Sequence, residues 1–215
     1  MLTIYGRKSS FNLQKVMWLV GELDIPHEHI ELGGSFGGLN DQAFRALNPH
    51  GKVPTVDDGG TIVWESQAIL RYLAASYGTP ALWSPDPKVR AQVDQWMDWS
   101  QCQLQPDFLM GVFWGFYRTP AAERNTAAVA AKVARTGEHL EKVERLMEGR
   151  AFLLGETLSL ADIVIGTHLY RYFNIDIARP SLPNVEGWYA RLKERTAYRE
   201  HVMVPFSELY GRLAY

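Results

Sequence analysis

The chain changes its hydrophobic periodicity once, across a stretch with three prolines that covers residues 78–87. Before this stretch, short apolar segments of strand type alternate with helical patterns, whereas after it apolar residues recur only at helical spacing. A proline-rich segment between two such regions is typical of an interdomain linker. We therefore expect an α/β domain over residues 1–78, a linker over 79–87 and an all-helical domain over 88–215.

The first region follows the order strand, helix, strand, helix, strand, strand, helix. Ser9 or Ser10 stands at the start of the first helix and Asp41 at the start of the second, where such side chains are preferred as caps. The run Asp57-Asp-Gly-Gly60 predicts a hairpin turn between two strands. This order describes a compact α/β domain with a mixed sheet, with elements expected over residues 2–5, 11–23, 27–32, 41–47, 53–56, 61–64 and 66–77.

The second region contains only helical patterns. A long helix is expected over residues 88–117 with a kink at Pro106, because proline lacks a backbone donor. Ser159 and Asp162 have the spacing of a capping box at the start of a later helix. The remaining helices are expected over residues 121–147 and 183–195.

Composition limits the function classes. The 215 residues are 47% hydrophobic and 21% charged with a formal net charge of −2, which is ordinary for a soluble globular protein and gives no basic surface for nucleic acid. We expect neither a signal peptide nor a membrane span. Cys102 is the one cysteine, and the histidines lack ligand spacing, so we expect no internal disulfide and no metal site. These features indicate a cytoplasmic protein.

Two short segments carry recognition chemistry. Lys52-Val53-Pro54 enters a strand and combines a cation, a backbone edge and a proline. Glu65-Ser66 places a carboxylate and a hydroxyl at an expected helix start, where free backbone N–H groups accumulate. Together they would form a cradle for a small zwitterionic peptide.

The order of these features resembles the glutathione transferase superfamily over the whole chain. The resemblance rests on the Val-Pro that enters a strand, the Glu-Ser pair that follows, and the Ser159-Leu-Ala-Asp162 cap of an apolar helix. The segment Ser10-Phe-Asn-Leu-Gln-Lys-Val16 is similar to the bacterial serine/cysteine-type branch, related to the theta, delta and beta classes. It implies a thioredoxin-like N-terminal domain, an all-helical C-terminal domain, and glutathione as co-substrate.

The resemblance also implies residue roles at the glutathione site. Pro54 would follow a cis peptide bond and expose the Val53 backbone to the cysteinyl unit as an added strand. Lys52 would meet the glycyl carboxylate. Glu65 would meet the γ-glutamyl ammonium, and Ser66 with its helix N-terminus would meet the γ-glutamyl carboxylate.

The thiol would lie at the first helix. In the family the thiol-activating residue lies six positions before the helix valine, which gives Ser10 here as a hydrogen-bond donor to the thiolate. Ser9 and Asn12 stay open as rivals, and Tyr5 is a weaker rival that we expect to be a packed strand residue. Aromatic and apolar side chains would line the electrophile pocket, although core packing remains an alternative for some of them: Phe11, Met110, Phe113, Trp114, Tyr117 and Phe206.

Three function classes remain. The first is glutathione conjugation to small hydrophobic electrophiles, and the second is disulfide reduction, peroxide reduction or dehalogenation at the same site. The third is a non-catalytic interaction module, which retention of the expected binding residues argues against. The family implies a homodimer through the helix at residues 66–77 and the helix that begins near residue 88, with Asp98 or Gln101 reaching the partner's γ-glutamyl group.

Overall fold

The computed structural model describes residues 1–213 and contains a four-stranded mixed sheet in the order β2-β1-β3-β4. Strand β1 pairs in parallel with β2 and antiparallel with β3, which pairs antiparallel with β4. The helix between β1 and β2 allows the parallel pair, and the two glycines after β3 allow the tight hairpin. The strand bounds are β1 Leu2–Tyr5, β2 His27–Ile30, β3 Thr55–Asp58 and β4 Thr61–Trp64.

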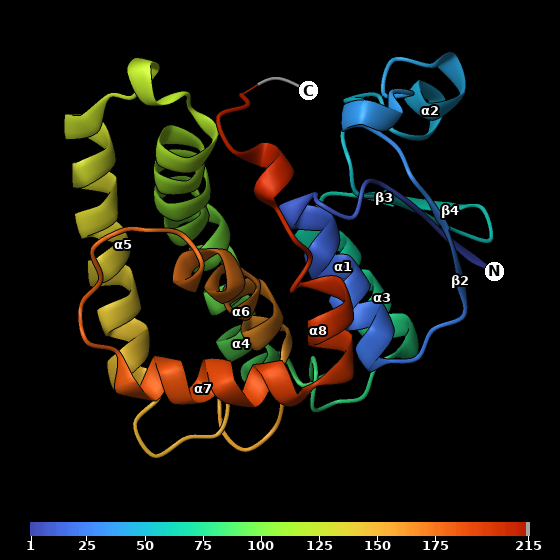
Figure 1. The fold of residues 1–215 in the computed structure, drawn as a ribbon. Coiled ribbons are helices and arrows are strands. Elements are labelled where there is room, and N and C mark those ends of the chain that lie inside the picture. The colour runs from blue at the N-terminus through green and yellow to red at the C-terminus, as the bar shows by residue number, and fades with distance from the viewer. Residues whose placement is uncertain (214–215) are drawn as a thin grey trace.

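Two helices, α1 (Phe11–Glu22) and α3 (Ser66–Tyr77), pack side by side against the sheet. Figure 1 shows them between the sheet and the helical remainder of the chain, so α1 is covered on both sides and most of its residues are buried. The connection from β2 to β3 contains η1 (Gly34–Phe36) and α2 (Gln42–Leu47). The expected thioredoxin-like domain with a mixed sheet is confirmed.

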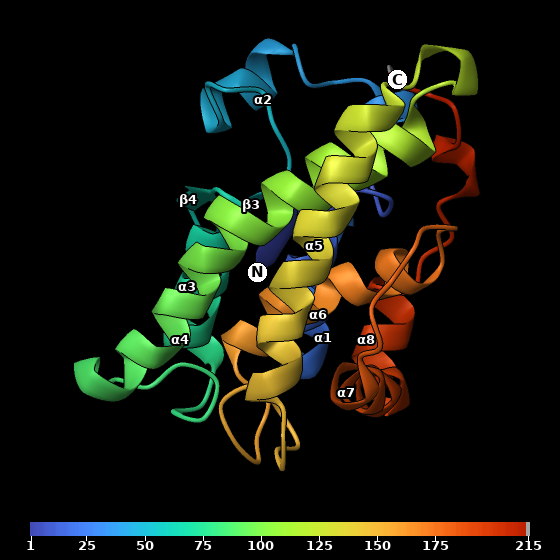
Figure 2. The same ribbon diagram turned by 90° about the vertical axis from the view of Figure 1, so that its left-hand side faces the viewer.

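The rest of the described chain is helical, also as expected. Figure 2 shows the helix that starts with α4 running beside α5. The bounds are α4 Pro87–Trp99, η2 Ser100–Leu104, η3 Pro106–Arg118, η4 Ala121–Glu123, α5 Thr126–Leu146, α6 Leu160–Phe173, α7 Pro183–Glu194, α8 Thr196–His201 and η5 Ser207–Leu209.

The expected helix over residues 88–117 is a more complex element. It begins as α4 and continues through the π-helical segments η2 and η3, which flank Gln105. Pro106 has no N–H to donate and its ring crowds the carbonyl four residues earlier, so a widened turn relieves a conflict that a regular α-helix could not.

Other boundaries also differ from the sequence-based expectation. The strand expected at residues 53–56 begins at Thr55, because Pro54 cannot donate to the ladder. The helix expected from residue 121 begins at Thr126, where Asn125 accepts a capping hydrogen bond from the Ala128 N–H at 3.0 Å. Asp41 is the N-terminal cap residue of α2 by position, but within residues 1–213 its side chain makes no capping bond. Helix α8 was not expected.

Helix α6 lies at the centre of the helical part and begins with the expected capping box. The Asp162 carboxylate accepts hydrogen bonds from the Ser159 N–H at 2.9 Å and from the Leu153 N–H at 2.8 Å. Burial raises the pKa of Asp162 to about 6, although these hydrogen bonds act in the opposite direction. The prediction for Ser159 and Asp162 is confirmed.

Helices α3 and α4 are tied together within the chain. Arg71 forms ion pairs with Asp94 at 2.8 Å and with Asp98 at 2.6 Å. The Gln67 amide donates to the Met97 carbonyl at 2.9 Å and to Gln101 Oε1 at 3.3 Å. These contacts fix the start of α3 relative to the helical part.

Candidate active site

Three chain segments leave the sheet at the same end. Tyr5 at the end of β1 lies opposite Thr55 at the start of β3, and Thr55 lies opposite Trp64 at the end of β4. Gly6 packs so closely against Val53 that a Cβ at residue 6 would lie 3.3 Å from the Val53 Cβ. The register therefore brings the residues after β1, before β3 and after β4 together.

The loop before β3 is held by Asn48, which is 2% exposed. Its Nδ2 donates to the Lys52 carbonyl at 2.9 Å and to Thr55 Oγ1 at 3.0 Å, and its Oδ1 accepts from the His50 N–H at 3.0 Å. The Lys52 side chain is exposed, and the peptide bond that follows Val53 is cis. Asn48 is therefore a supporting residue of the candidate site.

The Val53 backbone is an open edge. Within residues 1–213, neither its N–H nor its C=O makes a hydrogen bond with another part of the chain. Such an edge can accept an added extended segment as a further strand.

The start of α3 combines backbone strain with free donors. Glu65, the residue before the helix, has φ 69° and ψ 115°, a conformation that costs a non-glycine residue about 1–3 kcal/mol. Its side chain is exposed, whereas Ser66 is buried at the first helical position. Backbone strain of this kind clusters at ligand sites, because it aims a residue where the ligand needs it.

Ser10 precedes α1. Its N–H donates to the Arg7 carbonyl at 2.9 Å and its carbonyl accepts from the Gln14 N–H at 3.0 Å. Its hydroxyl makes no capping hydrogen bond to the described helix. The hydroxyl is half-buried and is not used to cap α1, so it can serve a ligand.

A cavity of about 150 Å³ lies beside the start of α1. Its lining includes the three residues considered as thiol contacts, which are Ser9, Ser10 and Asn12. Three of the side chains expected at the electrophile pocket also line it, namely Phe11, Met110 and Trp114. The structure therefore brings polar donors of α1 and apolar side chains of η3 to one cavity.

The other three expected pocket residues pack against one another. Phe113 is fully buried and stacks on Tyr117 with ring centroids 5.2 Å apart, and the Phe206 ring meets both of these rings. Phe113, Tyr117 and Phe206 do not line this cavity, so their contact with an electrophile stays a prediction. Met110 and Trp114 share one side of η3, whereas Phe113 and Tyr117 share a neighbouring side that the C-terminal segment covers.

Tyr5 is a packed strand residue. Its ring lies 6.0 Å from that of Phe44, and it does not line the cavity. Burial, and then the nearby Asp57 and Glu28 carboxylates, raise the pKa of its hydroxyl. This position argues against Tyr5 as a thiol contact.

The sequence reasoning missed a polar cluster beneath and around the cavity. Lys15 is fully buried in α1, and its Nζ donates to Asn12 Oδ1 at 3.1 Å and to Gln105 Oε1 at 2.5 Å. Arg171 of α6 donates to the Ser9 carbonyl at 2.8 Å. The sequence does contain a signal for Lys15. Residues 11, 15 and 19 lie on one side of the helix at a spacing of four, and Lys15 is the charged residue between the apolar Phe11 and Leu19.

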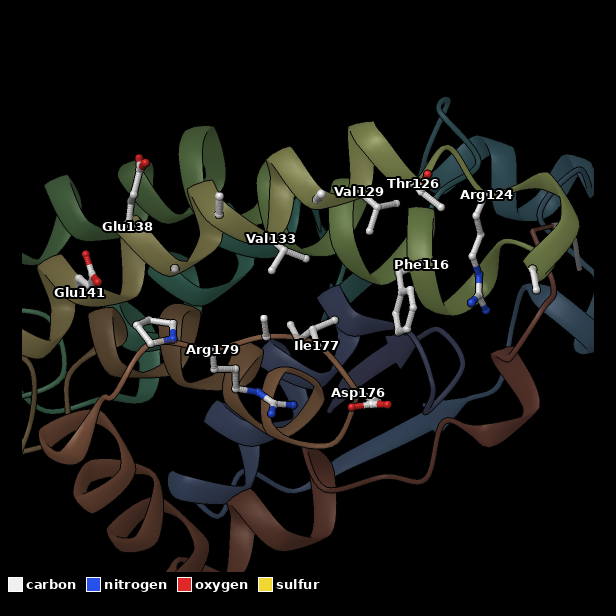
Figure 3. Close-up of a pocket in the computed structure, with 16 residues that line it drawn as sticks. Phe116, Arg124, Thr126, Val129, Val133, Glu138, Glu141, Asp176, Ile177 and Arg179 are labelled. Carbon is white, nitrogen blue, oxygen red and sulfur yellow. The ribbon is translucent and has the colours of Figure 1, made fainter.

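A larger hollow lies elsewhere. A groove of about 890 Å³ runs between α5 and residues 176–180 and shares no lining residue with the cavity. Figure 3 shows the Arg124 guanidinium and the Glu138 carboxylate far apart along its rim, with Val129, Val133 and Ile177 between them. Its apolar lining carries none of the donors that meet at the cavity beside α1.

Residues 1–213 contain neither a cluster of metal-ligating side chains nor a membrane-spanning helix. No three histidine, cysteine, aspartate or glutamate side chains come together as a metal site in this part of the chain. No helix within the same range has the length and apolar character needed to cross a bilayer.

Comparison with known proteins gives consistent matches. The family model described as the N-terminal domain of glutathione S-transferase matches residues 4–81, and the model of the C-terminal domain matches residues 126–191. Glutathione S-transferase GstB of Escherichia coli K12 is 37% identical over 209 residues, which cover 96% of this chain and 100% of GstB.

Solved structures agree with these matches. The theta class glutathione S-transferase of Xanthomonas axonopodis pv. citri, solved with glutathione bound, has a TM-score of 0.88 and 43% identity, covering 95% of this chain and 98% of its own. A delta-class glutathione transferase of Nilaparvata lugens has a TM-score of 0.85 and 25% identity, and the match covers 97% of this chain and 98% of the Nilaparvata lugens chain. The chain belongs to the glutathione S-transferase family.

Proposed function

We propose that this protein is a glutathione transferase that stabilises the thiolate of bound glutathione and conjugates it to small hydrophobic electrophiles. The observation that carries the proposal is the meeting of an open backbone edge at Val53, a strained helix start at Glu65 and an unused hydroxyl at Ser10 at one end of the sheet. The similar Xanthomonas axonopodis protein was solved with glutathione bound, which supports the same ligand here.

Each part of glutathione meets a group of matching chemistry. The Val53 backbone before Pro54 pairs with the cysteinyl unit as a short added strand. Glu65 attracts the γ-glutamyl ammonium, and Ser66 with the free N–H groups of α3 holds the γ-glutamyl carboxylate. Lys52 meets the glycyl carboxylate.

Ser10 lowers the pKa of the bound thiol. A free thiol has a pKa of about 8.5, so only a few per cent is thiolate at neutral pH, and lowering it by about two units requires roughly 2.7 kcal/mol. A hydrogen bond to a charged group contributes about 1.5–3 kcal/mol, and a helix N-terminus adds about 0.3–1 kcal/mol. A hydroxyl at the start of α1 therefore suffices without a general base, and the attacking nucleophile is the glutathione sulfur.

The electrophile lies in the cavity on the other side of the sulfur. Phe11, Met110 and Trp114 give this cavity apolar lining, and Ser10 lines the same cavity. An apolar electrophile held there is close to the thiolate, which converts a bimolecular encounter into a reaction of bound partners.

The proposal extends to organisation and location. Residues 1–78 form the glutathione-binding domain, residues 79–87 the linker, and residues 88–215 the helical domain that supplies the electrophile pocket. The protein acts as a cytoplasmic homodimer and uses no metal. Analytical ultracentrifugation tests the dimer, because a monomeric protein at micromolar concentration would contradict it.

The function is tested in two steps. Retention on immobilised glutathione with elution by free glutathione measures binding, and conjugation of chlorodinitrobenzene measures transferase activity. Binding without conjugation, combined with disulfide reduction, peroxide reduction or dehalogenation, would move the assignment to one of those reactions. A protein that ignores glutathione would be a non-catalytic interaction module and would overturn the proposal.

A further inference from the structure

Lys15 is an unusual buried residue. It is fully buried on α1, where lysine is almost never found without an acidic partner. No carboxylate within residues 1–213 lies at ion-pair distance from its Nζ. Its partners are the two amide oxygens of Asn12 and Gln105 and the Phe11 ring, whose centroid lies 4.9 Å from Nζ.

These contacts determine how the two amides are oriented. In its ammonium form Lys15 only donates hydrogen bonds, so this form holds the amide oxygen rather than the amide nitrogen toward it at both positions. Asn12 Oδ1 and Gln105 Oε1 are therefore held against Lys15, which leaves both NH₂ groups available to the surroundings. Asn12 and Gln105 both line the cavity that contains Ser10, whereas Lys15 does not.

The arrangement spans two distant parts of the chain. Asn12 and Lys15 belong to α1, and Gln105 lies between the two π-helical segments of the helical part. The Lys15 ammonium thus connects the helix that begins at the thiol site to the wall of the electrophile cavity.

The surroundings of Lys15 do not favour its charge. Burial lowers the pKa of Lys15 to about 7, and the attraction of Glu65 acts in the opposite direction. On α6, burial and the charges of Lys15 and Arg171 lower the pKa of His168. A methionine would fill the same space without a charge to bury, so packing alone does not explain a lysine here.

We propose that Lys15 is a positioning residue that turns the Asn12 and Gln105 amide N–H groups into the cavity, where they reinforce Ser10 as donors to the sulfur. The inference rests on the proposed glutathione site. Lys15 acts through Asn12 and Gln105 and does not touch the substrate.

The first experiment compares Lys15→Met and Lys15→Gln with Lys142→Met, a matched change at an exposed lysine on α5. At pH 7 we expect Lys15→Met to lower kcat/KM for glutathione and chlorodinitrobenzene about tenfold and to raise the pKa of the bound thiol, read from thiolate absorbance, by about one unit. The glutathione dissociation constant should stay within about threefold. Lys15→Gln, which keeps an N–H donor, should recover part of the rate, and Lys142→Met should behave as the wild type.

A double-mutant cycle with Asn12→Leu separates positioning from a structural role. If Lys15 acts through Asn12, Lys15→Met should cost less than about threefold in the Asn12→Leu background, because one of the two oriented amides is already absent and only Gln105 remains to be released. Additive losses, or an unchanged thiol pKa in folded Lys15→Met, would overturn the inference. Failure of both Lys15→Met and Lys15→Gln to fold would also overturn it, since Lys15 would then be structural.

The outcomes distinguish this inference from the proposed function. A wild-type protein that neither binds glutathione nor conjugates chlorodinitrobenzene contradicts the proposed function. An active wild type with Lys15 variants of unchanged rate and thiol pKa contradicts the inference alone.

Discussion

The end of the sheet and the cavity beside α1 are built in different ways. At the sheet end, Lys52, Val53, Glu65 and Ser66 come from two short segments that strand register brings together. At the cavity, side chains come from α1, η3, α6 and the C-terminal segment. A binding surface can thus be encoded locally, whereas the environment of the reacting sulfur depends on contacts between distant helices. The two regions should therefore respond differently to substitution.

The largest effect should fall on the core behind the cavity wall. Phe113→Ala should lower the free energy of unfolding by about 3–5 kcal/mol, because it empties a fully buried position. Trp114→Ala, at the neighbouring half-buried position that lines the cavity, should instead raise the KM for the electrophile with a smaller loss of stability. Denaturant unfolding and steady-state kinetics on both variants check this contrast. Equal losses of stability in the two variants would contradict the distinction between a core position and a cavity position.

The next effect belongs to the sheet end. Glu65→Gln should weaken glutathione binding about 30-fold, because a charge-assisted hydrogen bond to the ammonium becomes a neutral one. The kcat should change less than about twofold. Isothermal titration with glutathione measures this, with the exposed Glu148→Gln as control. A variant that binds normally but turns over slowly would place Glu65 in the chemistry rather than in binding.

Substitution at the start of α1 should have the opposite result, with a large effect on kcat and a small effect on glutathione binding. Ser10→Ala should lower kcat about tenfold and raise the pH midpoint of kcat/KM by about one unit, with glutathione affinity nearly unchanged. Ser9→Ala should change kcat by less than about twofold, since the contact from Arg171 uses the Ser9 carbonyl and not its hydroxyl. Reversal of the two results would assign the thiol contact to Ser9.

The smallest effect is a pH dependence of stability at Lys15. Burial lowers the pKa of Lys15 from 10.5 to about 7, so between these pH values the unfolded chain binds more protons than the folded one. The free energy of unfolding therefore rises with pH in this window. From pH 7 to pH 8 the free energy of unfolding of the wild type should rise by about 1 kcal/mol more than that of Lys15→Met, which lacks the titrating amine. Denaturant unfolding at both pH values tests this, and parallel changes in the two proteins would contradict it.

The same contrast explains what the sequence could predict. The bounds of β1, β4 and α3 and the capping box of α6 agree with the expected ones, since each depends on local pattern and capping chemistry. The segments of the sheet end were found because their residues lie close together in sequence. The contacts of Lys15 and Arg171 around the cavity were not predicted, because Lys15 meets Gln105, and Ser9 meets Arg171, only after the helices have packed.

The electrophile wall illustrates the limit most clearly. Met110, Phe113, Trp114 and Tyr117 have similar apolar character in the sequence. Met110 and Trp114 nevertheless line the cavity, whereas Phe113 is fully buried and the half-buried Tyr117 stacks on it. Which side of η3 faces which neighbour depends on the widened turns around Pro106 and on where the C-terminal segment lies. Neither feature has a local signature that could assign the four side chains.

The central claim is that the sheet end binds glutathione while the start of α1 acts on its sulfur. A crystal structure with glutathione tests it most directly. We expect the sulfur within about 3.5 Å of the Ser10 hydroxyl, the cysteinyl backbone paired with Val53, and the γ-glutamyl group at Ser66. A sulfur next to the Tyr5 hydroxyl, or glutathione seated away from Val53, would contradict the account.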